Sequence, residues 1–246
     1  MSKSVAVIIC AAGASKRFGG SRKKPLVDVG GRAVFMRSVE LFTEHEDVKQ
    51  TLLAISPEDE ELVEVKWGPN LKFFGVKICF GGQERFDTVK KALELVRDDI
   101  DLIAVHDAVR CCVTEKWINA CFAKAAETGA AILACPVTAT IKSVKDNTII
   151  QTVDRAGLYE AQTPQVFTAE LLRKAYQNLE NIDKSQVSDD CQLVEALGHK
   201  VSIVETDASN IKITTKSDIA IAEAILKSRP KAGPKGPAGP YIEAQW

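Results

Sequence analysis

The chain lacks the features that mark a metal-rich or nucleic-acid-binding protein. It has three histidines and seven scattered cysteines, with no Cys-x-x-Cys pair, which argues against a structural zinc site. We expect most of the cysteines to be buried thiols in a reducing compartment. Aromatic residues make up 6% of the chain, and the net charge is −1. Both values disfavour a general binder of nucleic acid.

Long apolar runs are missing as well. No stretch of the sequence reaches the length of a transmembrane span. An apolar strand pattern begins at about residue 5, which leaves no room for a signal or transit peptide. We therefore expect a cytoplasmic protein without a membrane partner. The 246 residues, 46% of them hydrophobic, suffice for the core of one large α/β domain or a small two-part protein.

A regular alternation of strand and helix patterns runs through the chain. Strand-like apolar runs lie at 5–10, 51–55, 76–80, 102–105, 130–135 and 201–204. Helical patterns lie at 33–42, from 56 onwards, around 89–96, and at 171–179, 188–198 and 217–227. Ser56 is expected to cap the second helix, with Pro57 in its first position. Repeated βα units predict a mostly parallel, twisted sheet with helices on both faces.

The segment 137–163 interrupts this alternation. Two β-branched runs, 140–144 and 148–153, flank a polar turn at 145–147, which predicts a β-hairpin arm. Such a hairpin has little core of its own and needs a surface to pack on. That surface is either a second copy of the chain or the arm's own domain. We expect residues 1–228 to form a single domain and the Pro/Gly-rich residues 229–246 to form a disordered tail.

A basic loop follows the first predicted strand. It opens with the small residues Ala11, Ala12 and Gly13, and its cations are Lys16, Arg17, Arg22, Lys23 and Lys24. Small residues let backbone N–H groups approach a ligand, and a polyphosphate suits such a site because it concentrates negative charge. A solvated basic loop is the alternative. The loop matches neither the P-loop pattern, which would require Gly at Phe18, nor the dinucleotide fingerprint.

Further polar clusters fall where predicted strands end, the edge at which open parallel sheets bind ligands. Gly81-Gly82 with Thr88 would allow close contact with a flat base, although an ordinary helix start has the same pattern. Asp107 leaves a buried strand and could hold Mg²⁺ or a substrate hydroxyl. We interpret the neighbouring His106 as a packed core residue. Lys212 interrupts a β-branched run, where it is either poised over a ligand or solvated at a sheet edge.

Together these clusters resemble one family, the 2-C-methyl-D-erythritol 4-phosphate cytidylyltransferases of the non-mevalonate isoprenoid pathway. The motifs that carry the resemblance are Ala11-Ala12-Gly13 with Arg17 and Lys24, Gly81-Gly82 with Glu84-Arg85, Val105-His106-Asp107-Ala108 with Arg110, Pro136-Val137 with Thr140, Thr152-Val153-Asp154-Arg155, Thr163-Pro164-Gln165 and Asn210-Ile211-Lys212. The resemblance implies a Rossmann-like nucleotidyltransferase fold with a protruding arm. It also implies transfer of CMP from CTP to methylerythritol phosphate, with release of pyrophosphate.

The resemblance further implies roles for individual residues. Nucleotide-binding residues would be Ala11, Ala12, Gly13, Gly82, Gln83, Thr88, Asp107 and Ala108. Catalytic residues would be Arg17, Lys24, Arg155 and Lys212, and residues contacting the polyol phosphate would be Asp107, Arg110, Thr140, Arg155 and Thr163. In the family the arm crosses to a partner subunit, so a homodimer is implied.

The chemistry of the reaction suits these residue types. A phosphate monoester that attacks the α-phosphorus of CTP is already an anion and needs no general base. The difficulty lies in bringing two anions together, which cations and Mg²⁺ can relieve. Asp107 is a candidate ligand of that Mg²⁺.

Two alternatives to this function stay open. A cytidylyltransferase for another polyol phosphate, such as ribitol 5-phosphate, would share the CTP half of the site. A catalytically silent nucleotide-binding protein would share only the base pocket.

The chain also departs from the family pattern in places. Ser15 stands where Gly is usual, and Ala139 stands where Asp is usual, which removes one carboxylate near the arm.

Overall fold

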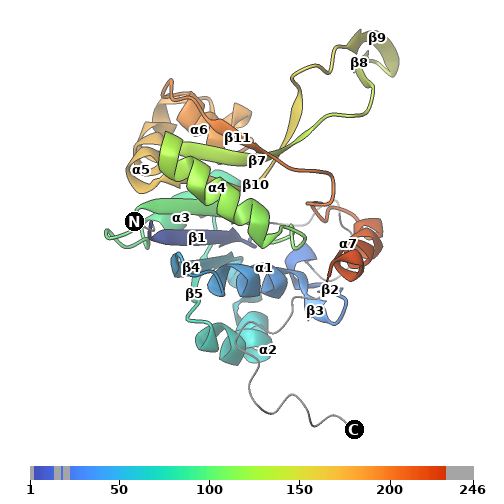
Figure 1. The fold of residues 1–246 in the computed structure, drawn as a ribbon. Coiled ribbons are helices and arrows are strands. Elements are labelled where there is room, and N and C mark those ends of the chain that lie inside the picture. Colours follow the sequence, from blue (N-terminus) through green and yellow to red (C-terminus); the bar gives the residue numbers. More distant parts are fainter. Residues whose placement is uncertain (1–2, 14–17, 19–22, 231–246) are drawn as a thin grey trace.

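The computed structural model describes residues 3–13, 18 and 23–230. Its centre is a seven-stranded sheet in the order β11-β7-β10-β6-β1-β4-β5 (Figure 1). The strands are β1 (Val5–Cys10), β4 (Val48–Ile55), β5 (Lys77–Phe80), β6 (Leu102–Asp107), β7 (Ala130–Pro136), β10 (Tyr159–Thr168) and β11 (Ser202–Glu205). Every neighbouring pair is parallel except those of β10, which runs antiparallel to both β6 and β7. The predicted mostly parallel sheet is confirmed.

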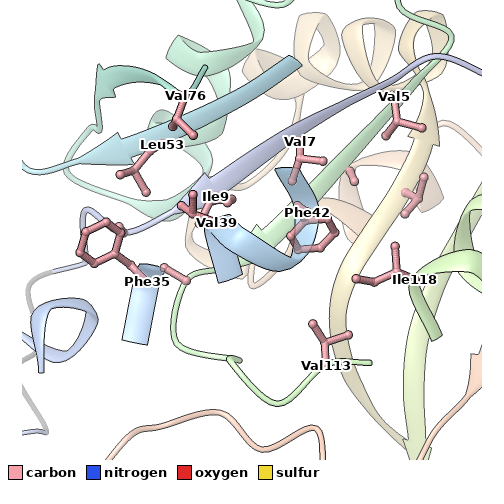
Figure 2. Packing of buried hydrophobic residues seen from close by; sticks show 14 of the residues in the cluster. Val5, Val7, Ile9, Phe35, Val39, Phe42, Leu53, Val76, Val113 and Ile118 are labelled. Atoms are coloured by element: carbon pink, nitrogen blue, oxygen red, sulfur yellow. The ribbon is translucent and has the colours of Figure 1, made fainter. Parts of the chain in front are cut away.

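Helices cover both faces of this sheet. The first face carries α1 (Val34–Thr43), α2 (Glu60–Phe73) and α4 (Glu115–Thr128), and the second carries α3 (Arg85–Leu93), α5 (Ala169–Gln177) and α6 (Asp190–Glu195). Successive side chains of a strand point to opposite faces. Odd-numbered residues of β1 therefore join the first cluster, and even-numbered ones join the second. Figure 2 shows Val7 and Ile9 of β1 in the first cluster, together with Val39 and Phe42 of α1.

A third, smaller apolar cluster lies outside the sheet. It joins α7 (Ser217–Ser228) to the short strand β2 (Asp28–Val29), which pairs with β3 (Arg32–Ala33). Four 3₁₀ turns complete the described elements: η1 (Lys24–Leu26), η2 (Pro57–Asp59), η3 (Asn178–Asn181) and η4 (Lys184–Gln186). Within the described residues, no helix combines the length and the apolar character needed to cross a bilayer.

The arm is a separate two-stranded sheet that projects away from the rest of the chain (Figure 1). It consists of β8 (Ile141–Lys145) and β9 (Thr148–Val153), so the predicted hairpin is confirmed. Asp146 and Asn147 form its turn with φ values of 49° and 59°, the left-handed conformation of tight hairpin turns. The arm also exposes apolar side chains: Val144 is 56%, Ile149 59% and Ile150 62% exposed.

The structure changes the predicted extent of the arm. The sequence places all of 137–163 in it, whereas β10 begins at Tyr159 and pairs with Pro136 of β7. Residues 159–163 therefore belong to the central sheet. The pattern concealed this strand because it contains Pro164, which cannot donate to a ladder, and polar residues on either side of it. The pairing with β7 shifts register between Ala161 and Gln165.

Other predicted elements differ at their ends. The first helix begins at Val34 because Ala33 pairs in β3. Ser56 makes no side-chain capping bond, and the turn η2 separates it from α2. β6 continues to Asp107, and residues 210–214 form no strand. Helix α4 and strands β2, β3 and β10 had no counterpart in the sequence prediction.

Candidate active site

A cavity of about 380 Å³ opens at the carboxyl ends of β1, β5 and β6. Its lining residues are Cys10, Ala12, Gly13, Lys24, Pro25, Gly82, Gln83, Glu84, Arg85, Thr88, Asp107, Val109 and Lys212. The carboxyl edge is where open parallel sheets place ligands. The structure thus brings together eight of the residues predicted for the site: Ala12, Gly13, Lys24, Gly82, Gln83, Thr88, Asp107 and Lys212.

The glycine pair after β5 forms one wall of the cavity. A Cβ atom on Gly81 would lie 2.3 Å from the Cβ of Ala12, and one on Gly82 would lie 2.2 Å from the Cβ of Asp87. No larger residue fits at either position without a shift. The N–H of Gly82 donates to Oγ1 of Thr88 (3.0 Å), which in turn donates to the Glu84 carbonyl (3.2 Å). The hydroxyl of Thr88 therefore fixes the loop that the sequence predicts to contact a base.

Asp107 is the electrostatic centre of the cavity. Its Oδ2 lies 2.7 Å from Nζ of Lys212 and 3.6 Å from Nε of Arg110, and its Oδ1 lies 3.5 Å from Nε of Arg85. Burial by itself would raise the pKa of the Asp107 carboxyl. The charges of Arg85, Lys212 and Arg110 outweigh burial and hold this pKa well below its usual range. Asp107 is consequently a carboxylate at any physiological pH.

Lys212 reaches Asp107 from an irregular segment, not from the strand that the sequence predicts. Asn210 anchors this segment, because its Nδ2 donates to Oε1 of Gln162 (2.8 Å) and to the Thr163 carbonyl (3.2 Å). Nη1 of Arg110 donates to the Asn210 carbonyl at 2.7 Å. Arg110 thus ties the end of β6 to the Lys212 segment instead of lining the cavity.

Thr163 lies beneath the cavity. It is 4% exposed; its Oγ1 accepts from the N–H of Asp107 (3.0 Å) and shares a hydrogen bond with Nδ1 of His106 (3.1 Å). Burial lowers the pKa of His106 to about 3, so the imidazole is neutral. His106 is a packed core residue, as expected. The position of Thr163 supports the end of β6 and gives it no place on the cavity wall.

The remaining predicted residues lie around or away from the cavity. Ala11 and Ala108 are buried beside it; their N–H groups donate to the carbonyls of Ala54 (2.7 Å) and Cys10 (3.1 Å). Thr140 and Arg155 are exposed on the arm, where Nη1 of Arg155 donates to the Thr138 carbonyl. The structure does not bring these two residues to the cavity of their own chain.

The predicted basic loop is described only in part. Arg17, Lys16 and Arg22 lie outside the described residues. Lys24 lines the cavity. Its neighbour Lys23 instead pairs with Glu58 and Asp59 at the start of the second helical segment, with both N–O distances at 3.0 Å. Of the two described cations of this loop, Lys24 therefore faces the cavity and Lys23 does not.

Two charged cavity residues, Glu84 and Arg85, were not among the predicted site residues. Arg85, the first residue of α3, lines the cavity and contacts Asp107. Its place in the Glu84-Arg85 motif was a signal, but nothing in the sequence indicated what it touches.

The oxygen donors around the cavity suit a divalent cation only in one way. Among residues 3–13, 18 and 23–230, no group of three or more His, Cys, Asp or Glu side chains could hold a metal ion. Mg²⁺ is commonly held by one or two carboxylates together with substrate phosphates. An ionised Asp107 on the wall of a cavity of nucleotide size fits this pattern, and an all-protein cage does not.

Comparison with known proteins gives a consistent result. The family model of 2-C-methyl-D-erythritol 4-phosphate cytidylyltransferase matches residues 5–228. A protein of that name from Endomicrobium trichonymphae is 44% identical over 224 residues, which are 91% of this chain and 99% of the relative. Another, from Rhodopirellula baltica, is 37% identical over 235 residues, covering 91% and 95%. A 4-diphosphocytidyl-2C-methyl-D-erythritol synthase structure from Anaerococcus prevotii matches with a TM-score of 0.79 at 28% identity, covering 92% of this chain and 97% of that one.

Proposed function

This chain belongs to the 2-C-methyl-D-erythritol 4-phosphate cytidylyltransferase family, and from that premise we infer the reaction and propose how its residues perform it. The chain transfers CMP from CTP to 2-C-methyl-D-erythritol 4-phosphate and releases pyrophosphate, giving 4-diphosphocytidyl-2-C-methyl-D-erythritol. The observation that supports this activity at the site is the cavity at the ends of β1, β5 and β6. It combines a glycine wall with Lys24 and Lys212.

The proposed pose places the base against the wall formed by Gly82 and Thr88. The triphosphate then lies along residues 11–13, within reach of Lys24. The acceptor phosphate approaches on the side of Asp107 and Lys212. Because that phosphate is already an anion, the protein's task is to orient it and to offset the negative charge that accumulates as the bond forms.

A divalent cation is proposed as the cofactor. Asp107 would supply its protein oxygen, and the nucleotide phosphates would supply most of the others. When bound, Mg²⁺ would offset phosphate charge. Lys24 and Lys212 act independently of it as fixed cations, with Lys212 held at 2.7 Å from the Asp107 carboxylate.

We propose a homodimer in which the arm of one subunit completes the site of the other. Arg155 and Thr140, predicted to contact the polyol phosphate, are exposed on the arm and away from their own cavity. The same arm exposes Val144, Ile149 and Ile150, and a patch of this kind is typical of a surface that another chain covers.

The activity is tested by measuring pyrophosphate release from CTP in the presence of Mg²⁺. Methylerythritol phosphate is compared with ribitol 5-phosphate as the acceptor. We expect rapid pyrophosphate release when the acceptor is methylerythritol phosphate, and none when it is ribitol 5-phosphate. A preference for ribitol 5-phosphate would reassign the acceptor. Binding of CTP without release from either polyol phosphate would show a silent nucleotide-binding protein.

A further inference from the structure

Behind the cavity, a chain of buried charged and polar side chains continues beyond Asp107. Arg85 contacts Asp107 through Nε, at 3.5 Å, and Asp190 through Nη1, at 2.5 Å. Asp190 is the first residue of α6 and is 1% exposed. Its other oxygen, Oδ1, accepts from the hydroxyl of Tyr176 on α5 at 2.5 Å. Neither Arg85, Asp190 nor Tyr176, the side chains of this series beyond Asp107, was predicted as a site residue.

The start of α6 is itself fixed. Oε1 of Gln165 in β10 accepts from the N–H groups of Asp190 and Cys191, each at 3.2 Å. Nε2 of Gln165 donates to Oδ2 of Asp189 at 2.8 Å. Gln165 of β10 therefore fixes the backbone N–H of Asp190, and the hydroxyl of Tyr176 fixes its carboxylate. This carboxylate presents one oxygen to Arg85 in a set position.

Stability is a weak explanation for this arrangement. Nη2 of Arg85 is buried without a hydrogen-bond partner among the described residues, and an unpaired buried donor costs free energy. A buried ion pair is often no more stable than apolar side chains of the same volume. The electrostatics nonetheless keep the pair charged, because Asp190 and Asp107 together raise the pKa of Arg85 against the opposing effect of burial.

The distances show how Arg85 is shared between the two carboxylates. A guanidinium pairs best with a carboxylate through two nitrogens at about 2.7–2.9 Å. Arg85 makes its short contact with Asp190 and a longer one with Asp107. Lys212 makes the short contact with Asp107, at 2.7 Å. Asp190 thus draws Arg85 away from Asp107 and leaves that carboxylate to Lys212.

We propose that Asp190 is a positioning residue for the reaction, which acts through Arg85 to preserve the Asp107–Lys212 pair at the cavity. The proposal rests on the proposed function, which places Asp107 and Lys212 beside the acceptor phosphate. With a neutral side chain at position 190, Arg85 moves onto Asp107 as a two-nitrogen pair. Lys212 then loses its partner and its set position at the cavity.

The test is a double-mutant cycle on pyrophosphate release. Asp190→Asn is expected to lower kcat about 10- to 100-fold, the usual effect of removing a residue that orients a ligating or catalytic group. Asp190→Glu, which keeps the carboxylate, is expected to restore most of the rate. In a Lys212→Ala background the loss caused by Asp190→Asn should shrink to about twofold or less, because the group it positions is gone. Asp183→Asn, at an exposed turn, is the matched control for the loss of a carboxylate.

Each outcome decides between the explanations. A full loss in both backgrounds means that Asp190 only supports the fold and overturns the proposal. So does a normal kcat in folded Asp190→Asn. If that variant does not fold, Tyr176→Phe, which removes one hydroxyl, replaces it in the cycle with an expected loss of a few-fold. Wild-type protein that releases no pyrophosphate rejects the function as well, whereas an active wild type with additive losses rejects only the role of Asp190.

Discussion

At the scale of single residues, one carboxylate organises the cations of the cavity. Asp107 holds Lys212 directly and is flanked by Arg85 and Arg110. Lys212 and Arg85 are thus held at the cavity by ion pairs with Asp107, which limits the reorganisation needed when charge develops. Electrostatic groups fixed in this way contribute most when the reaction moves negative charge.

Lys24 is the cavity cation for which kinetics give the clearest prediction. Lys24→Ala should lower kcat by about 10²–10³ while raising the KM for CTP much less, because its charge matters most as negative charge builds at phosphorus. Steady-state kinetics with varied CTP measure both constants. Lys72→Ala, at an exposed position of α2, is the control for loss of an ammonium. A purified Lys24→Ala protein with near-normal kcat would rule the role out.

His106 makes stability depend on pH. Burial lowers its pKa to about 3 from an ordinary value of 6.5. Between these values the unfolded chain binds a proton at this residue and the folded chain does not. Stability therefore falls as pH drops from 6.5 towards 3, by about 1.4 kcal/mol per pH unit from this group. Urea unfolding at pH 7 and pH 5 measures the effect. The difference in unfolding free energy between the two pH values should shrink in His106→Gln but not in the control His199→Gln. An unchanged difference in His106→Gln would contradict this role of His106.

Residue-level prediction from the sequence succeeded where a motif was local and stopped where partners were distant. Gly82 and Asp107 lie just after predicted strands, and Lys24 and Thr88 lie in the segments that follow two of them, so the common edge of the sheet brings them together. The contact of Arg85 with Asp190 joins residues 105 positions apart. The fold creates it by bringing the starts of α3 and α6 together, and no spacing rule could have revealed it.

At the scale of elements, the start of α3 builds the wall of the cavity. Glu84 and Asp87 form a reciprocal capping box, each side chain accepting from the other's backbone N–H. The N–H of Gly82 donates to the hydroxyl of Thr88 in the same helical turn. This wall of the cavity is therefore part of a helix start and moves only if the helix start moves.

Gly82→Ala should disrupt this element. Its Cβ would lie 2.2 Å from the Cβ of Asp87, so α3 must shift, at a cost of about 1–3 kcal/mol and with weaker binding of CTP. Calorimetric titration with CTP and thermal unfolding measure the two effects. Gly68→Ala is the control, because its added methyl meets no atom within 4 Å and Ala is favoured over Gly inside a helix. Unchanged CTP affinity in Gly82→Ala would contradict the assignment of this wall.

Element prediction followed the hydrophobic pattern and failed where the pattern was polar. β1, β4, β6 and β7 are apolar and bounded by turns, and their patterns identified them. β10 contains Gln162, Thr163 and Gln165, whose side chains bond inward to the residues that support the site. The polar residues that hid this strand are thus the ones that serve the cavity.

At the scale of the whole molecule, the proposed dimer predicts that two inactive variants restore activity when their subunits are mixed. Lys24→Ala damages the cavity, and Arg155→Ala damages the arm. If the arm serves the partner's cavity, a heterodimer of the two variants contains one intact site. Random exchange of subunits between two inactive variants should then restore up to about a quarter of the wild-type rate. Pyrophosphate release after co-refolding measures this.

The control for subunit exchange is each variant refolded alone, which should stay inactive. If the arm serves its own cavity, every heterodimer carries one defect in each site, and mixing restores nothing. Ile150→Asp offers a second check, because a charge on the exposed arm should produce monomers in sedimentation. Phe73→Asp, at a position 85% exposed on α2, should leave the sedimentation unchanged.

The place of β10 in the sheet has a consequence for synthesis on the ribosome. Among the strands of the described residues, β10 alone lies between β6 and β7, yet it follows both of them in the chain. A nascent chain that has emerged only as far as β7 holds the four-stranded part β6-β1-β4-β5 and β7 without a neighbouring strand, with one edge of β6 still open. Open edges invite association between chains. Translation pauses between residues 136 and 168 should therefore increase aggregation of unfinished chains more than pauses after residue 168.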